Sequence, residues 1–216
     1  MKKEVYGPRP SEWMSVLRPL MNERRREGHR FSPERSALLV IDMQRYFLER
    51  SSHAFIPASE AIVGNARTIL EAFRSHSLPV VFMRHALLRD EDPGAMGRWW
   101  GDVLHEDDLL SSIVPELAPL DDELVVRKTQ YSAFVGTDLD EMLRAKGVGQ
   151  VIVTGVQTHL CCESTARDAF MRGYDVFFVM DGTASKNEDL HLSSLKTLTE
   201  GFATIVTTEE VLSWLK

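Results

Sequence analysis

The stretch VTGVQTHLCCESTA, residues 153–166, decides the fold of this chain, because it joins the end of an apolar strand to the start of a helix. The expected strand covers residues 151–153, and the expected helix covers residues 163–171. Cys161 would then lie at or near the helix start, where backbone N–H groups and the helix dipole lower the pKa of a thiol below about 8.5. We therefore predict that Cys161 is a nucleophile for covalent acyl transfer.

The alternative is that Cys161 is a small buried apolar residue, which composition alone favours. The position at a strand-to-helix turn favours the nucleophile. The chain has two cysteines, Cys161 and its neighbour Cys162, and a disulfide between adjacent residues requires a strained ring. One helical residue turns a side chain by about 100°, so we expect Cys162 to pack or to line a pocket.

Five further apolar runs alternate with amphipathic stretches, and they lack the period-two pattern of half-exposed strands. These runs are residues 37–41, 79–83, 123–126, 176–179 and 203–206. Helices are expected over residues 59–76, 137–147, 163–171, 189–199 and 209–215. Strands and helices in alternation predict an α/β fold with three α-β-α layers around a six-stranded, mostly parallel sheet of the Rossmann type. Ligands bind beyond the carboxyl ends of such strands.

Composition narrows the function classes. The 216 residues suit one domain, and we expect it to cover residues 31–216. A net charge of −7 argues against nucleic acid and anionic lipid as partners, so we expect a small-molecule substrate. Neither a signal peptide nor a membrane span is apparent, which predicts a cytoplasmic protein that contacts no membrane.

Two regions interrupt the alternation. Residues 1–30 form an extension with a possible capping helix, whose apolar face holds Trp13, Leu17, Leu20 and Met21 and which precedes the basic run at residues 24–26. The extension either packs on the domain or a neighbouring subunit, or covers the active site. The second region, residues 87–122, is long and acidic and contains Trp99 and Trp100, so we expect a partly ordered loop over a cleft or at a subunit contact.

Two more polar residues end predicted strands. Asp42 follows a buried strand, where a carboxylate needs a partner or a cleft; as a general base it would take the thiol proton and return it to a leaving amine. Capping of the next turn is the alternative for Asp42. Lys128 stands at another strand end and would hold the carboxylate and the thiolate ionised by Coulomb attraction, although most lysines are solvated surface groups.

Three segments together resemble the signature segments of the isochorismatase-like cysteine hydrolases. They are LVIDMQ at residues 39–44, KTQYSAF at residues 128–134 and GVQTHLC at residues 155–161, and the likeness spans most of residues 35–208. In the branch that includes nicotinamidases and N-carbamoylsarcosine amidases, the resemblance implies that Cys161 attacks a carbonyl, that ammonia leaves and that water resolves the thioester. It assigns the catalytic roles to Asp42, Lys128 and Cys161.

The resemblance also implies the backbone geometry around the nucleophile. A non-proline cis peptide would fall between Val156 and Gln157. The oxyanion hole would use the backbone N–H groups of Gln157 and Cys161, and each such donor is typically worth about 2.7–4 kcal/mol of barrier. Family members commonly form dimers or tetramers, so we expect a homo-dimer or homo-tetramer with Trp13, Trp99 and Trp100 as candidate contacts.

Two departures place the chain within the superfamily. Metal-binding nicotinamidases carry an Asp-x-His pair after the second strand, whereas this chain has FMRH at residues 82–85. His53 and His85 do not make a metal site by themselves, so we expect no metal and no other cofactor. True isochorismatases, which cleave a vinyl ether, typically have glycine where Cys161 stands.

Several residues around the signature segments are candidates for substrate binding: Gln44, Phe47, His85, Trp100, Tyr131, Thr158 and His159. His159 serves equally well as a structural histidine. Arg84 or His85 would suit a substrate carboxylate, because arginine forms bidentate pairs with planar anions.

The leading interpretation is a hydrolase that cleaves the C–N bond of a small amide, carbamoyl or ureido compound through a cysteine thioester. One alternative keeps the fold and cleaves a vinyl ether with Asp42, without a covalent intermediate. The other alternative is an inactive homologue that serves as a binding module, against which the intact Asp42, Lys128 and Cys161 count.

Overall fold

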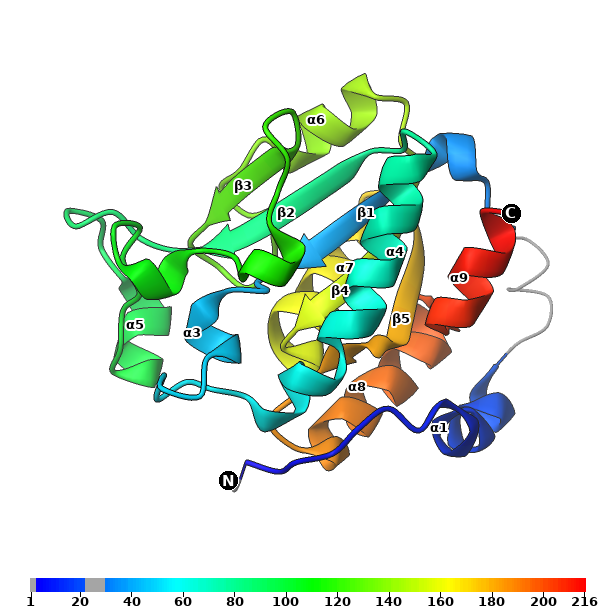
Figure 1. Ribbon diagram of the computed structural model, residues 1–216, viewed down its shortest axis with the longest axis horizontal. Helices are drawn as coiled ribbons and strands as arrows, with labels where there is room; N and C mark the ends of the chain where they lie inside the picture. Colours follow the sequence, from blue (N-terminus) through cyan, green and yellow to red (C-terminus); the bar gives the residue numbers. More distant parts are fainter. Residues whose placement is uncertain (1–2, 22–29) are drawn as a thin grey trace.

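The computed structural model of the chain describes residues 3–21 and 30–216. Six strands form one parallel sheet in the order β3-β2-β1-β4-β5-β6 (Figure 1). The strands are β1 (Ser36–Ile41), β2 (Val80–His85), β3 (Leu124–Lys128), β4 (Gln150–Val156), β5 (Asp175–Ala184) and β6 (Thr204–Val206). The strand order reverses between β1 and β4, and ligands bind beside such a switch point in open parallel sheets. The predicted α/β class with a six-stranded sheet is confirmed, and every pairing is parallel.

Helices cover both faces of the sheet, as Figure 1 shows. The longer helices are α1 (Pro10–Leu17), α4 (Val63–Ser75), α6 (Leu139–Ala145), α7 (Glu163–Met171), α8 (Glu188–Gly201) and α9 (Thr208–Trp214). Alternate residues of β1 enter opposite cores: Leu39 packs with residues of α1, α6, α7 and α8, and Leu38 packs with residues of α4 and α9. All six residues of β1 are buried, which explains why its sequence is apolar throughout.

Some predicted boundaries differ from the structure. The fifth strand runs on to Ala184, and the register of its pairing with β4 shifts between Val153 and Gly155. The expected helix from residue 59 begins instead as a 3₁₀ turn, Pro57–Ala61, ahead of α4. Helix α6 has Asp138 rather than Thr137 as its N-cap, and the Thr137 hydroxyl donates back to the Ala133 carbonyl and accepts the Leu139 N–H.

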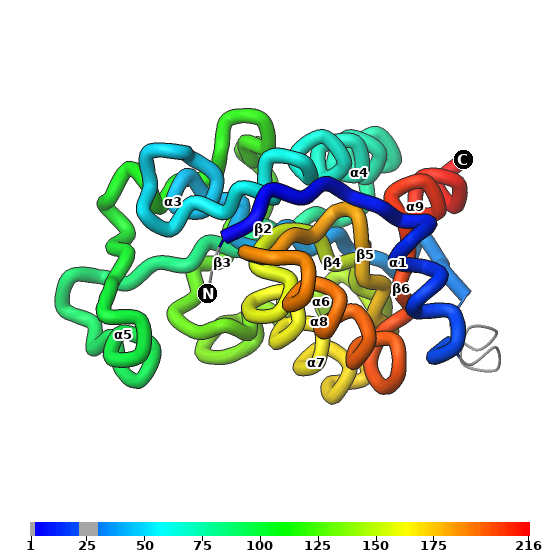
Figure 2. Tube along the Cα trace, turned by 90° about the horizontal axis from the view of Figure 1, so that it is seen from below, coloured from blue at the N-terminus to red at the C-terminus, as the bar shows by residue number. Residues whose placement is uncertain are grey.

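The N-terminal extension contains α1 and a 3₁₀ turn, Arg18–Leu20. Trp13 and Leu17 are buried against the core, whereas Leu20 is 38% exposed, so only part of the predicted apolar face is covered. The basic run at residues 24–26 lies outside the described residues. Ahead of α1 the chain runs alongside the end of β5 and the start of α8 (Figure 2), where Glu4 N–H donates to the Lys186 carbonyl.

The acidic loop of residues 87–122 is ordered around α5 (Gly94–Trp100) and the 3₁₀ turns Leu109–Ser111 and Pro115–Leu117. A bridge between Leu87 and His105 closes its base. A short helix, α3 (Arg45–Leu48), lies beside it and follows β1. Both segments stand beyond the carboxyl ends of β1, β2 and β3 and form part of the site described next.

Candidate active site

Three strand ends bring Asp42, Lys128 and Cys161 together. Asp42 follows β1, Lys128 is the last residue of β3, and Cys161 lies in a π-helical turn, Thr158–Cys162, between β4 and α7. Lys128 Nζ stands 2.8 Å from Asp42 Oδ2 and 3.4 Å from Cys161 Sγ. The side chains of Lys128 and Asp42 are fully buried, and Cys161 is 8% exposed. Cys161 is therefore the most exposed of the three, although Gln157 and Leu160 of its turn, rather than Cys161 itself, line the neighbouring pocket.

The Lys128 ammonium contacts three polar groups: it forms an ion pair with the first and donates hydrogen bonds to the other two. They are the Asp42 carboxylate, the Cys161 sulfur and the Gln130 carbonyl, which lies at 3.0 Å. Burial by itself lowers the pKa of Lys128, but Asp42 and then Cys161 more than offset burial and raise this pKa to about 12. Lys128 therefore stays charged at neutral pH and holds a buried positive charge between the carboxylate and the sulfur.

Cys161 lies near the helix start, as predicted, because the π-helical turn that carries it leads directly into α7. The pKa of its thiol differs from the prediction. Burial, and then the Asp42 carboxylate, raise the pKa of Cys161 above its ordinary value, although Lys128 acts in the opposite direction. The expected low pKa is therefore wrong for the resting site: the sulfur is held as a neutral thiol beside a carboxylate that can take its proton.

A close approach of two strands positions Asp42. Ile41 pairs with Gly155 across β1 and β4, and a Cβ on Gly155 would stand 2.0 Å from the Ile41 carbonyl oxygen. Gly155 has φ 120°, a conformation that other residues rarely adopt. Asp42 itself has φ 50°, in the left-handed region that aspartate tolerates better than most residues. Glycine at position 155 thus lets the two strand ends, which carry the carboxylate and the thiol, lie side by side.

The turn that carries Cys161 begins at Gln157. The Val156–Gln157 peptide is cis, at the position that the resemblance implied. The Gln157 carbonyl accepts the N–H groups of Leu160 and Cys162. The N–H of Gln157 itself donates to no acceptor in the described part of the chain, which leaves it available to a ligand. The Gln157 N–H is one of the two donors that the predicted oxyanion hole requires.

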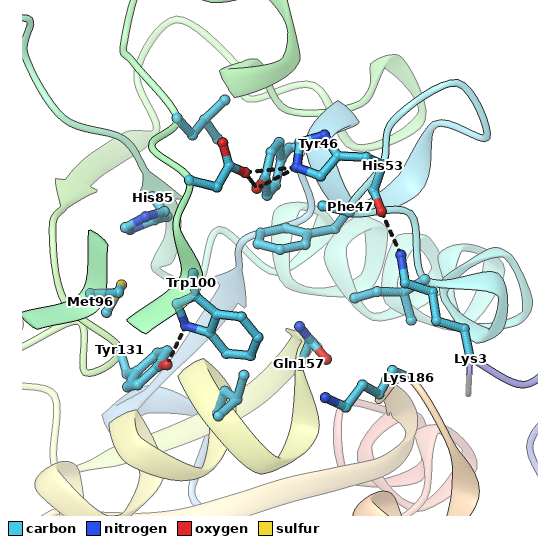
Figure 3. Close-up of a pocket in the computed structure, with 15 residues that line it drawn as sticks. Lys3, Tyr46, Phe47, His53, His85, Met96, Trp100, Tyr131, Gln157 and Lys186 are labelled. Carbon is cyan, nitrogen blue, oxygen red and sulfur yellow. Dashed lines mark hydrogen bonds and ion pairs between the residues drawn. The ribbon is translucent and has the colours of Figure 1, made fainter. Parts of the chain in front are cut away.

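A pocket of about 320 Å³ opens beside this turn (Figure 3). Gln157 and Leu160, from the same turn as Cys161, line it, and so do Phe47, Ile56 and Leu104. This volume is in the range of small-molecule sites, and an apolar lining with a few polar groups is typical of them.

Four of the predicted substrate-binding residues line the pocket: Phe47, His85, Trp100 and Tyr131. Trp100 Nε1 donates to the Tyr131 hydroxyl at 2.7 Å, which joins the acidic loop to the segment after β3. Burial, and then the nearby Lys128 charge, lower the pKa of His85 to about 4, so this imidazole is neutral at neutral pH.

Gln44, Thr158 and His159 are not among the residues that line the pocket, and each has a hydrogen-bond partner within the chain. The buried amide of Gln44 donates to the carbonyls of His85 and Ser111, and its oxygen accepts the His85 N–H. The Thr158 hydroxyl lies 2.8 Å from His191 Nδ1, and His159 Nδ1 lies 2.9 Å from the Ser185 hydroxyl. These bonds give each of the three side chains a structural role, and a part in substrate binding stays a prediction.

Arg84, a candidate for binding a substrate carboxylate, already has partners within the protein. Its guanidinium pairs with the Glu106 carboxylate and donates to the Ser111 hydroxyl at 3.2 Å. A substrate anion would have to displace Glu106, so Arg84 does not serve as its partner.

Sequence reasoning missed several polar pocket residues: Lys3, Tyr46, Asp102 and Lys186. His53, to which the sequence assigns no role, also lines the pocket. Asp102 Oδ2 lies 2.7 Å from His53 Nε2 and accepts from the Tyr46 hydroxyl. No motif links these positions, which lie on separate segments. The one usable signal is the placement of Tyr46 just after the strand that carries Asp42.

The described residues contain no group of three or more His, Cys, Asp or Glu side chains that could hold a metal ion. Among those same residues, no helix has the length and apolar character that a membrane crossing requires.

Comparison with known proteins places this site in a family. A sequence model of the isochorismatase domain matches residues 36–210. Nicotinamidase 3 of Arabidopsis thaliana is 45% identical over 175 residues, which cover 79% of this chain and 84% of that protein. Enterobactin synthase component B of Escherichia coli K12 is 36% identical over 84% of this chain, but the match spans only 64% of that protein's length.

A solved structure agrees with the sequence matches. The cysteine hydrolase from Pseudomonas syringae pv. phaseolicola 1448A superposes with a TM-score of 0.83 at 32% identity, covering 86% of this chain and 94% of that one. The chain therefore belongs to the isochorismatase-like superfamily of hydrolases.

Proposed function

We propose that this protein hydrolyses the C–N bond of a small amide, carbamoyl or ureido compound, with Cys161 as nucleophile. The observation that carries the proposal is the contact of one buried ammonium, Lys128 Nζ, with both the Asp42 carboxylate and the Cys161 sulfur beside the pocket. A carboxylate that can take a proton from a neutral thiol is what a covalent acyl transfer needs at its first step.

In the first half of the reaction Asp42 takes the thiol proton, and Cys161 Sγ bonds to the substrate carbonyl carbon. The carbonyl oxygen becomes an oxyanion and binds the backbone N–H groups of Gln157 and Cys161. Protonated Asp42 then gives its proton to the nitrogen, the C–N bond breaks, and ammonia or an amine leaves. A thioester on Cys161 remains.

In the second half a water attacks the thioester carbon, and Asp42 takes a proton from that water. The C–S bond breaks, the proton returns to sulfur, and the acid is released. Lys128 stays protonated throughout, because its pKa of about 12 is far above neutral pH. Its role is to hold Asp42 in the carboxylate form and to stabilise charge that develops on sulfur.

The comparisons support this choice of bond and nucleophile. The Arabidopsis relative bears the name nicotinamidase, and the Pseudomonas syringae structure bears the name cysteine hydrolase. The name of the family itself supports the second candidate, vinyl-ether cleavage that uses Asp42 without a thioester.

Activity of Cys161 variants separates these candidates. We expect Cys161→Ala and Cys161→Ser to lose ammonia release from amide substrates while unfolding at the same temperature as the wild type. The matched control is Cys162→Ala, since Cys162 is buried next to Cys161 and has no role in the scheme. Retained amide turnover in Cys161→Ala would rule out the thioester route.

The alternatives have their own signatures. Vinyl-ether cleavage predicts that Cys161→Ala stays active on isochorismate-type ethers while Asp42→Asn does not. An inactive binding module predicts that the wild type cleaves neither class of substrate.

Self-association also stays a prediction. Trp99 is 81% exposed and remains a candidate contact between subunits, whereas Trp13 is buried within its own chain and is no longer a candidate. Light scattering that finds only monomer would contradict the prediction of self-association.

A further inference from the structure

Two lysines line the pocket from segments that the catalytic groups do not use. Lys186 lies in the loop between β5 and α8, and Lys3 belongs to the N-terminal segment that runs alongside this loop. Figure 3 shows both on the side of the pocket away from His85 and Met96. They therefore lie apart from the strand end that carries Lys128, with which His85 pairs in the sheet.

Neither ammonium has an acidic partner among the described residues. Lys3 Nζ donates to the His53 carbonyl at 2.7 Å, and Lys186 Nζ stands 5.7 Å from the centre of the Trp100 ring. Burial, and then the charge on Lys186, lower the pKa of Lys3. Because both lysines line the same pocket, an anion bound between them would be attracted by both charges.

The other charged groups of the pocket do not balance these lysines. Asp102 is the pocket carboxylate, and it is already bound by His53 and by the Tyr46 hydroxyl. His85 is neutral at neutral pH, because its pKa is lowered to about 4. Among the residues that line the pocket, the two lysines thus have no carboxylate paired with them.

The N-terminal segment is built onto the Lys186 loop by several hydrogen bonds. Glu4 N–H donates to the Lys186 carbonyl at 2.8 Å, and the Tyr6 hydroxyl accepts the Ser185 N–H at 2.8 Å. Farther along, Trp13 Nε1 donates to Glu188 Oε1 at 2.7 Å. These bonds hold the Lys186 backbone in place and bring Lys3 to the pocket, so the N-terminal extension forms part of the pocket wall.

We propose that Lys3 and Lys186 form an anion-binding corner, and that the substrate carries a carboxylate at the end remote from the bond that Cys161 cleaves. This inference rests on the proposed function and narrows its substrate class to amide, carbamoyl or ureido acids. The corner binds the remote carboxylate equally in the ground state and the transition state, so it acts on KM rather than on kcat.

The test compares substrates that differ at the remote group, which is charged in one and neutral in the other: succinamate against butanamide, and N-carbamoylglycine against its methyl ester. Ammonia release gives kcat and KM for the wild type, Lys186→Met and Lys3→Met. The matched control is Lys196→Met, an exposed lysine of α8 that does not line the pocket.

We expect the wild type to prefer the acid of at least one pair by about tenfold or more in kcat/KM, the size of one charge-assisted contact. Lys186→Met and Lys3→Met should each remove most of that preference by raising KM for the acid, with kcat and the neutral substrate little changed. Lys196→Met should keep it. Equal rates on acid and neutral partners, or equal losses on both in Lys186→Met, would overturn the anion-binding corner while leaving the amidase proposal intact.

A binding measurement separates the two proposals if no amide is cleaved. Calorimetry with Cys161→Ala measures the affinity for succinamate and for butanamide without turnover. If Cys161→Ala binds succinamate more tightly than butanamide, and Cys161→Ala/Lys186→Met does not, the anion-binding corner is supported even where the amidase proposal fails. Equal binding of the two ligands refutes the corner.

Discussion

Lys128 Nζ stands 2.8 Å from Asp42 Oδ2, and both side chains are fully buried. No backbone N–H reaches either oxygen of Asp42 in the described part of the chain, so Lys128 provides the charge compensation that this carboxylate needs. A buried ion pair adds little net stability over apolar residues, but removing one partner strands the other charge. The buried Asp42–Lys128 pair is therefore better accounted for by a chemical role at the site than by a contribution to the stability of the fold.

The first prediction concerns this pair. We expect Lys128→Met to lower the free energy of unfolding by about 3–5 kcal/mol, because it leaves Asp42 buried without a counter-charge. Asp42→Asn/Lys128→Met should recover most of that loss and remain inactive. Urea unfolding measures both values, and an unchanged midpoint in Lys128→Met would contradict the argument.

The second prediction concerns thiol reactivity. Because burial and Asp42 raise the pKa of Cys161, iodoacetamide should label it at pH 7 more slowly than it labels a free cysteine. Asp42→Asn removes a charge that raises this pKa and keeps Lys128, which lowers it, so labelling should become faster. Peptide mapping separates Cys161 from Cys162, which is fully buried and serves as the internal control. Rapid labelling of the wild type below pH 7 would show that the thiol is ionised in the resting site.

The third prediction concerns the close approach of β1 and β4. Gly155→Ala would force a Cβ to within 2.0 Å of the Ile41 carbonyl oxygen at a φ that alanine disfavours. We expect a loss of at least about 1–3 kcal/mol of stability, the usual cost of such backbone strain, and a loss of activity as Asp42 moves. Gly64→Ala is the control, because a Cβ there has no atom within 4 Å. Similar unfolding midpoints for the two variants would refute this role of Gly155.

The fourth prediction concerns His191, which is fully buried behind the catalytic turn and contacts Thr158 and Trp13. Burial lowers its pKa from 6.5 to about 3, so the folded state binds its proton less readily than the unfolded state. Stability is therefore unaffected above pH 6.5 and falls as the pH drops toward 3, by about 2 kcal/mol from this group at pH 5. Urea unfolding between pH 7 and 5 should show a shallower decline in His191→Gln. An equal decline in both proteins would assign the acid sensitivity to other groups.

Local sequence patterns are sufficient to predict the sheet and the three strand-end residues. An apolar run without alternation predicts burial on both faces, which holds for β1 and β4 but not for the edge strand β3, where Val125 is 46% exposed. A polar residue that ends or follows such a run lies at the carboxyl end of the strand, as Asp42 and Lys128 do, and Cys161 lies in the turn after β4. For this reason the amino-acid sequence alone identifies Asp42, Lys128 and Cys161 as candidates for one site. The boundary of β5 is predicted less accurately, because its register shift depends on the neighbouring strand.

Which side chains line the pocket and are free to bind a ligand could be learned only from the tertiary structure. Gln44 and Arg84 have suitable chemistry, but distant carbonyls and Glu106 already occupy their donors. Lys3 and Lys186 lie 183 positions apart in the numbering and meet only because the N-terminal segment bonds to the loop after β5.

The sequence by itself determined which strands form and which groups stand at their ends, because local runs of apolar residues mark the buried strands. Only the tertiary structure decided the direction of the Cys161 pKa shift and the side chains left free to bind a ligand. Both depend on burial and on competing hydrogen bonds from residues far away in the chain, and no local pattern encodes those contacts.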